Sequence, residues 1–230
     1  MAAEQIAVII GAGSGLSASL TRQCAARGMR VAMAARNPGK LEDLVTETGA
    51  SAYQCDASDE QSVEQLFNAL DTNLGTPDLV VYNPSYRTRG PVAELDPAEV
   101  KKTLLVSCYG GFLVGQAAAR RMMAAGKGSI QFTGASASVK GYVNSAPFAM
   151  GKFGLRGLAQ SMARELAPKN VHVAHFVIDG GIRRREPGES DNPDKTLDPE
   201  AIAQSYLAVH DQHRSAWTWE VELRPWVENF

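Results

Sequence analysis

The chain has 230 residues, and its composition, 44% hydrophobic and 21% charged, is typical of a globular protein with a substantial core. Lys and Arg number 23 and Asp and Glu number 25, and the resulting net charge of −2 argues against a nucleic-acid partner. The three cysteines are widely spaced and form no CxxC pair, so we expect neither disulfides nor a metal site. No secretory signal is evident, and no apolar run approaches the ~18 residues of a membrane span. We therefore expect a cytoplasmic protein without membrane contact.

Strands and helices are predicted to alternate from the N-terminus onward. Ile6 to Ile10 is a short apolar run ending in glycine, typical of a strand buried on both faces, and apolar residues at helical spacing follow from Leu16 until Gly28. The same patterns predict strands at 31–35, 52–55, 78–82, 129–132 and 171–178, and helices at 39–48, 60–74, 97–125 and 146–167. Such alternation requires right-handed crossovers, so we predict an α/β fold, a Rossmann-like doubly wound parallel sheet of about seven strands with helices on both faces.

The regularity lapses after Ile178. Residues 180–198 are rich in Gly, Pro and charges, which predicts a loop, and its run of three arginines at 183–185 is interpreted as solvated surface because acidic residues follow. A helix from Asp198 to about His210 and an edge strand from Trp217 to Leu223 complete the chain. The aromatics of that strand either cap their own core or pack against a second subunit. No repeat, linker or second core is evident, so residues 1–230 are predicted to form one domain.

The segment Gly11-Ala12-Gly13-Ser14-Gly15 lies between the first predicted strand and the first helix. Glycines in that position allow a phosphate to approach the backbone closely, and the helix N-terminus offers N–H donors. The segment therefore predicts a loop that holds the pyrophosphate of a dinucleotide. A tight turn without a ligand is the alternative.

The end of the second strand predicts which dinucleotide is bound. The position where an acidic side chain would accept hydrogen bonds from a ribose 2′-OH is Ala35, and Arg36 follows it. A guanidinium suits the 2′-phosphate of NADP, so we expect NADP, with NAD less favoured. An arginine that serves only the protein surface is the alternative.

With these elements the chain resembles the short-chain dehydrogenase/reductase family over residues 5 to 225. The TGxxxGxG loop of that family is matched from Gly11 with Ser17 at the third glycine, its acidic residue after the third strand by Asp56, and its NNAG motif by the residues at 82–85. The resemblance implies that the cofactor contacts Gly11, Gly13, Ser14, Gly15, Leu16, Arg36, Asp56, Ala57, Asn83, Pro84, Lys152 and Gly180.

The resemblance also identifies the catalytic positions, of which only the lysine is retained. The YxxxK pair of the family reads Phe148-Ala149-Met150-Gly151-Lys152, so phenylalanine stands in the tyrosine's place. Ser136 lies one residue from the family's serine position, and Ser107 occupies the position of the active-site asparagine. Lysine and tyrosine four residues apart share a helix face, where the lysine lowers the tyrosine pKa and binds the ribose.

Because Phe148 cannot donate a proton, two functions remain open. The first is an NADP(H)-dependent oxidoreductase that transfers hydride to a small carbonyl or an activated C=C or C=N substrate, with the proton supplied by Ser136, a water, Tyr142 or Tyr86. The second is a pseudoenzyme that keeps the NADP site as a binding or regulatory module. In both cases the small apolar residues of the 146–167 helix match the helix pair of the family's oligomers, so a homodimer or homotetramer is expected.

Overall fold

The computed structural model of the protein describes residues 4–183 and 193–228. Its centre is a seven-stranded sheet in the order β3-β2-β1-β4-β5-β6-β9, and every neighbouring pair is parallel. The strands are β1 (Ile6–Ile10), β2 (Arg30–Ala35), β3 (Ser51–Gln54), β4 (Leu79–Tyr82), β5 (Gly128–Thr133), β6 (Val171–Ile178) and β9 (Glu220–Leu223). The predicted Rossmann-like parallel sheet is confirmed, and its strand order reverses between β1 and β4.

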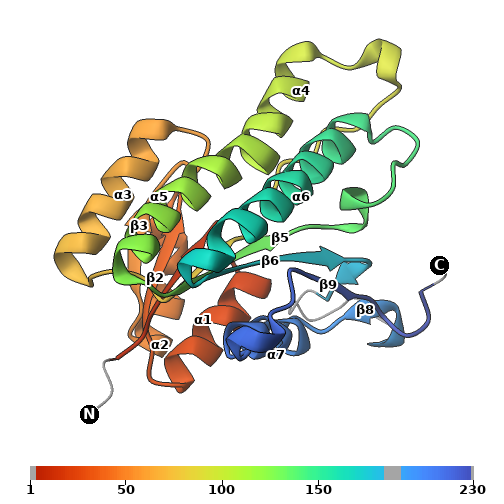
Figure 1. Cartoon of the computed structure of the whole chain (residues 1–230). Coiled ribbons are helices and arrows are strands. Elements are labelled where there is room, and N and C mark those ends of the chain that lie inside the picture. Colours follow the sequence, from red (N-terminus) through yellow and green to blue (C-terminus); the bar gives the residue numbers. More distant parts are fainter. Residues whose placement is uncertain (1–3, 184–192, 229–230) are drawn as a thin grey trace.

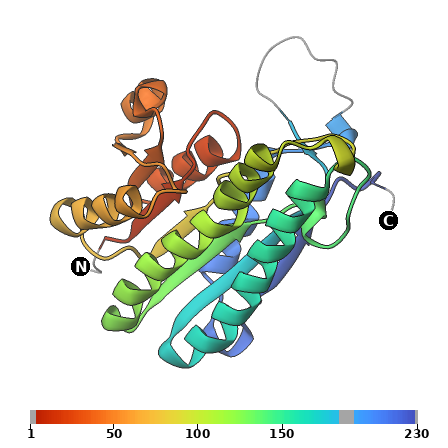
Figure 2. The same cartoon turned by 90° about the horizontal axis from the view of Figure 1, so that it is seen from above.

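Helices cover both faces of the sheet (Figure 1). One face carries α3 (Glu60–Asn73), α5 (Gly110–Ala125) and α6 (Ala146–Leu166), with α4 (Pro97–Leu104) extending the line of α5. The other face carries α1 (Leu16–Ala26), α2 (Glu42–Thr48) and α7 (Pro199–His210). Seen from above in Figure 2, α5 and α6 run side by side along the sheet.

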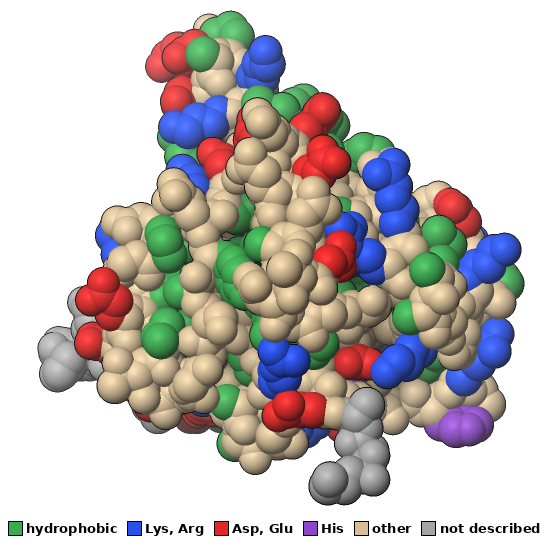
Figure 3. Space-filling model, turned by 90° about the vertical axis from the view of Figure 1, so that its left-hand side faces the viewer, with side chains coloured by type: hydrophobic (Ala, Val, Ile, Leu, Met, Phe, Trp, Pro, Cys, Tyr) green, Lys and Arg blue, Asp and Glu red, His purple; other side chains and the backbone are tan. Residues whose placement is uncertain are grey.

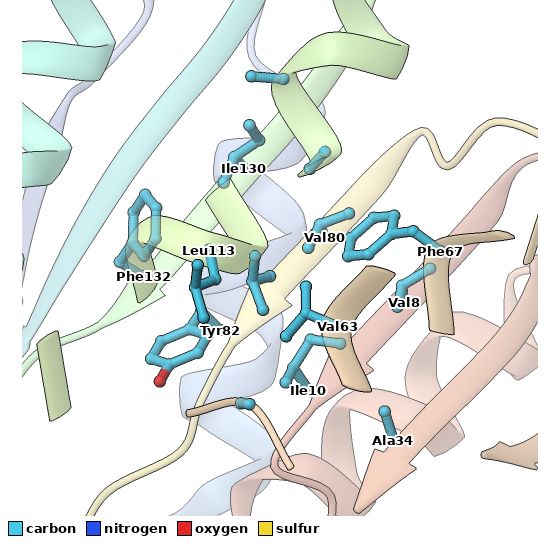
Figure 4. Packing of buried hydrophobic residues seen from close by; sticks show 14 of the residues in the cluster. Val8, Ile10, Ala34, Val63, Phe67, Val80, Tyr82, Leu113, Ile130 and Phe132 are labelled. Atoms are coloured by element: carbon cyan, nitrogen blue, oxygen red, sulfur yellow. The ribbon is translucent and has the colours of Figure 1, made fainter. Parts of the chain in front are cut away.

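The core is divided by the sheet into two apolar layers. Along β1, Val8 and Ile10 belong to the layer beneath α3, α5 and α6, whereas Ala7 and Ile9 belong to the layer against α1 and α7. Successive side chains of a strand point to opposite faces, so a strand buried on both sides is apolar throughout. Figure 4 shows the first layer, in which Phe67 of α3 packs over these strands. Burial of β1 on both faces fixes the place where the glycine loop begins.

The predicted 97–125 helix is interrupted by a π-helical turn, Leu105–Tyr109. A π turn disturbs the ordinary ladder of main-chain hydrogen bonds, and here the Tyr82 hydroxyl donates to the Val106 carbonyl (2.5 Å). Gly110 follows the turn and packs so closely that a Cβ on it would lie 2.5 Å from the Ala57 carbonyl oxygen. The turn thus brings the helix against the loop that follows β3.

The C-terminal strand is shorter than predicted. It begins at Glu220, and the segment around Trp217 is not a strand. The Trp217 ring stacks on His172 with 4.7 Å between centroids, and its indole N–H donates to the Gln212 carbonyl. Through those two contacts the Trp217 side chain packs against residues of this same chain. The prediction of an edge strand is confirmed, since β9 pairs only with β6 in the described sheet.

Two other predicted segments also differ in detail. The helix predicted at 39–48 begins as a 3-10 turn, Pro38–Leu41, before α2. The predicted loop at 180–198 contains a short parallel pair, β7 (Gly181–Ile182) with β8 (Thr196–Leu197), and beside it Arg183 lies 3.8 Å from the Asp198 carboxylate. The remaining arginines of that run, Arg184 and Arg185, lie outside the described residues.

Charged side chains of both signs are interspersed over the face shown in Figure 3. This mixture agrees with the nearly balanced counts of basic and acidic residues, 23 and 25. Within residues 4–183 and 193–228, the helices are all too short or too polar to cross a membrane.

Two glycine substitutions test the packing beside the π turn. Gly110→Ala places a methyl group against the backbone of Ala57, so we expect a loss of about 1–3 kcal/mol in the free energy of unfolding. Gly157→Ala is the matched control, because it lies in α6 with open space around its Cβ position and should gain up to about 1 kcal/mol. Urea unfolding of both variants measures the difference, and equal stabilities would contradict the close approach.

Candidate active site

The glycine loop starts at the carboxyl end of β1, beside the carboxyl end of β4. Gly11 has a φ of +77°, a left-handed conformation that favours glycine, and its N–H donates to the Ala34 carbonyl (2.9 Å). A Cβ on Gly11 would lie 2.7 Å from the backbone nitrogen of Pro84, whereas Gly13 and Gly15 have open space at that position. The loop is therefore tight against β4 and open on its other side.

The N-terminus of α1 directly follows this loop and has no side-chain cap. Gly15 is the N-cap residue, and the first turn contains no acidic side chain. The first N–H groups of a helix lack intrahelical acceptors, and the helix dipole adds a partial positive charge to them. This end of α1 is thus suited to an anion such as a pyrophosphate.

Ser17, at the third glycine position of the family motif, ties the loop to the end of β4. Its hydroxyl donates to the Gly11 carbonyl (3.1 Å) and accepts a hydrogen bond from the Asn83 side-chain amide (2.7 Å). The side chain is almost fully buried at 2% exposure. The serine therefore holds the two halves of the loop together with hydrogen bonds that a glycine could not make.

A cleft of about 610 Å³ lies beside the loop. Eight of the predicted cofactor residues line it, namely Gly11, Gly13, Ser14, Arg36, Asp56, Ala57, Asn83 and Pro84. The other predicted residues, Gly15, Leu16, Lys152 and Gly180, are not among the described lining residues. Leu16 is buried in the core of the α1 layer, and a Cβ on Gly180 would lie 2.7 Å from Pro225.

Two basic side chains line the cleft past the end of β2. Arg36 and Lys40 both border it, and neither makes a hydrogen bond or an ion pair with another described residue. Lys40 was missed by sequence reasoning, although a second cation four residues after Arg36, at the start of a predicted helix, was a usable signal. The pair places positive charge next to Ala35, where an acidic residue would bind a ribose hydroxyl.

Asp56 lies on the wall formed after β3. Its carboxylate accepts hydrogen bonds from the backbone N–H (2.9 Å) and the hydroxyl (2.6 Å) of Ser58. Burial alone would raise its pKa, but those two hydrogen bonds and the nearby Arg36 outweigh burial and lower the pKa. Asp56 is thus a fixed, ionised acceptor at the cleft.

Lys152 is a buried residue of α6. Its ammonium donates to the Thr133 carbonyl at the end of β5 (2.7 Å), and the residue is only 2% exposed. Burial lowers its pKa to about 8. The lysine of the family motif is therefore held in place by the sheet.

Phe148, which the resemblance aligns with the family's tyrosine, lies one turn before Lys152 on α6. The Arg87 guanidinium lies over its ring, 4.3 Å from the centroid, and the Lys152 ammonium lies 5.8 Å from the same centroid. Both distances are within the range of cation–π attraction. The site thus presents a cation above an apolar ring at the position that the resemblance assigns to the tyrosine.

The other two predicted catalytic residues, Ser107 and Ser136, have separate environments. Ser107 is fully buried, and its hydroxyl accepts from the Tyr86 N–H (3.3 Å) and donates to the Tyr86 carbonyl (3.1 Å). Ser136 is half-buried and lines a second cavity of about 480 Å³ with Arg87 and Tyr142. Ser107 therefore positions the chain after β4, and Ser136 faces open space.

The described residues contain no group of three or more His, Cys, Asp or Glu side chains that could hold a metal ion.

The arrangement of the site suits the binding of an anionic nucleotide at the glycine loop. The second cavity lies next to this loop and is lined by basic side chains. Arg87 was missed by sequence reasoning, because its neighbour Phe148 is distant in the chain.

Burial of Lys152 predicts a pH-dependent stability. A pKa lowered from 10.5 to about 8 in the folded chain disfavours folding by about 3 kcal/mol below pH 8, progressively less above it, and not at all above pH 10.5. Lys152→Met should therefore raise the free energy of unfolding at about pH 7 by up to about 3 kcal/mol, with the gain vanishing near pH 10.5. Urea titrations at both pH values measure this, with exposed Lys169→Met as control. A variant less stable than the natural chain at the lower pH would contradict it.

The chain is similar to several known proteins and solved structures. Residues 5–183 match the family model of short chain dehydrogenases. The trans-4-hydroxycyclohexanecarboxylate dehydrogenase of Sinomonas cyclohexanicum is 32% identical over 182 residues, 74% of this chain and 70% of that protein. A crystal structure of a short-chain dehydrogenase from Rhodopseudomonas palustris is 37% identical with a TM-score of 0.84, covering 96% of this chain and 99% of the other. A metagenomic short-chain oxidoreductase in complex with NADP is 26% identical with a TM-score of 0.85, over 97% and 98% of the two chains. The chain belongs to the short-chain dehydrogenase/reductase family of oxidoreductases.

Proposed function

We propose that this protein is an NADP(H)-dependent oxidoreductase that acts on a small carbonyl or an activated C=C or C=N compound without a tyrosine acid. The observation that carries the proposal is the Arg36 and Lys40 pair at the cleft, next to Ala35. Two cations without an acidic partner in hydrogen-bonding range match a 2′-phosphate, and Ala35 has no carboxylate that could accept from a bare ribose hydroxyl. The related metagenomic oxidoreductase, solved with NADP, supports the same cofactor.

The residues of this chain would divide the work of holding the cofactor. The glycine loop and the start of α1 would take the pyrophosphate, Arg36 and Lys40 the 2′-phosphate, and Asp56 the adenine side of the cleft. Lys152 would hold the nicotinamide ribose, as the family resemblance implies. Bound NADPH supplies the hydride.

The proton would come from a group other than residue 148. The Tyr86 hydroxyl is already engaged by Glu99 (2.5 Å) and Lys102 (3.1 Å), so Tyr86 is disfavoured as a donor. Ser136 and Tyr142 border the second cavity, where a hydroxyl or a water they bind can reach a substrate. A substrate that needs little acid assistance fits this arrangement best.

A pseudoenzyme that binds NADP without turnover is the second candidate. The buried Ser107 hydroxyl is committed to the Tyr86 backbone, and Phe148 has no acidic proton, so two catalytic positions serve structure. For either function we propose one cytoplasmic domain over 1–230 that assembles as a homodimer or homotetramer through α6, the helix that the family pairs.

Charge at the 2′-phosphate position is tested by substitution. Arg36→Ala and Lys40→Ala should each weaken NADPH binding by about 10- to 100-fold, since each removes a charge-assisted hydrogen bond worth ~1.5–3 kcal/mol. NADH affinity should change little. Calorimetric titration with both nucleotides measures the ratio, and equal losses for NADPH and NADH would refute the assignment.

Turnover is tested by placing a tyrosine hydroxyl at residue 148. Phe148→Tyr should raise ketone reduction by up to ~10²-fold, because a positioned general acid contributes ~10²–10⁴-fold. Phe148→Leu is the control, since it alters the ring without adding an acid. Loss of NADPH absorbance over a panel of ketones, enones and imines reports the rate. No turnover by any form, with NADPH bound, would favour the pseudoenzyme.

A further inference from the structure

We propose that the second cavity, between residues 87–90 and 142–145, is a subsite for an anionic group, a carboxylate or a phosphate, so that the substrate is an anionic carbonyl or imine compound. The inference rests on the proposed function, because it names the substrate class of that same site. Three features of the cavity support an anion site: its charge, the way its walls are fixed, and its place beside Phe148.

The cavity contains positive charge and hydrogen-bond donors without an acidic side chain among its described lining residues. It has a volume of about 480 Å³ and is lined by Arg87, Arg89, Gly90, Ser136, Tyr142, Val143, Asn144 and Ser145. A cavity of that size can take a small organic acid. Guanidinium groups bind carboxylate and phosphate oxygens in pairs, and hydroxyls and amides can complete the contacts.

Neither arginine has its charge matched by a carboxylate in the part of the chain that the structure describes. The Arg87 guanidinium lies over the Phe148 ring and near Tyr142, and neither Arg87 nor Arg89 makes a hydrogen bond or an ion pair there. Lys140, whose ammonium lies 5.7 Å from the centroid of the Tyr142 ring, is paired with the Asp179 carboxylate (3.6 Å). Burial and the neighbouring Arg89 lower the pKa of Arg87. An anion between the two guanidinium groups would relieve this repulsion.

The segment that carries the arginines is fixed at both ends. At its start, the Ser107 hydroxyl holds the N–H and the carbonyl of Tyr86. At its end, the Gly90 N–H donates to the Asn144 carbonyl (3.1 Å), which joins the two walls of the cavity. Gly90 has a φ of +156°, a conformation that favours glycine. A segment held in this way needs little ordering when a ligand binds.

The cavity is also next to the expected chemistry. Residues 83–85 line the nucleotide cleft, and the same segment continues to Arg87 and Arg89 at the cavity. The Arg87 guanidinium lies 4.3 Å from the centroid of Phe148, and Ser136 borders the cavity from the other side. An anionic group held here would place the rest of a small substrate beside the position of the family's catalytic tyrosine. Phe148 then serves as a platform for Arg87.

Matched ligand pairs test the charge requirement by calorimetry on the NADP+-saturated protein. One pair is cyclohexanecarboxylate and its uncharged carboxamide, and the other is cyclohexyl phosphate and cyclohexanol. We expect at least one anion to bind tenfold or more tightly than its neutral partner. The pair that shows the preference identifies the acidic group.

Substitutions then locate the site. Arg87→Gln and Arg89→Gln should each reduce that preference several-fold, and the double variant should abolish it while the neutral partner binds as before. Arg164→Gln, an exposed arginine of α6, is the control and should keep the full preference. No preference for either anion, no binding by any probe, or a preference that survives in the double variant would overturn the proposal.

The failure of the cofactor proposal is distinguishable from the failure of this one. NADP+ binding is measured first, and its absence would count against the proposed function alone. The carboxylate pair can then be titrated on the free protein, where Arg87 and Arg89 should still set the preference. Hydride transfer is not needed for any of these measurements.

Discussion

The close approach of Gly11 to Pro84 is the constraint on which the nucleotide cleft and the second cavity both depend. Parallel strands bring the carboxyl ends of β1 and β4 together, and only a residue without a Cβ fits against the Pro84 backbone. Ser17 and Asn83 close the same junction with hydrogen bonds. From Pro84 the chain passes directly to the arginine segment, so the position of β4 fixes the distance between the two candidate binding sites.

Two positions that the family resemblance implies to be catalytic have clear structural contacts in this chain. Ser107 holds the main chain just before Arg87, and Phe148 offers its ring to the Arg87 guanidinium. A tyrosine hydroxyl would be a proton donor, whereas a guanidinium remains charged and can only donate hydrogen bonds. If Phe148 stands in the tyrosine's place, as the resemblance implies, the site has a positive charge where the family has an acid. Such a charge binds an anion or stabilises one that develops, and it suits substrates that need little protonation.

Local patterns in the sequence were sufficient to predict much of this structure. Apolar runs predicted the central strands, and glycines after the first strand predicted the loop, because both signals lie within a few residues. Trp217 was wrongly assigned to a strand, since its stacking on His172 joins segments far apart in the chain. The Arg87 contact with Phe148 was missed for the same reason. The π turn also depends on a distant group, the Tyr82 hydroxyl.

A crystal structure of the protein with NADP+ and the preferred anion tests the central claim most directly. We expect the 2′-phosphate between Arg36 and Lys40 and the pyrophosphate on the glycine loop. The acidic group of the ligand should lie on Arg87 and Arg89, with its remaining atoms toward Phe148. A 2′-phosphate that points away from Arg36, or an anion bound elsewhere while the second cavity stays empty, would contradict these expectations.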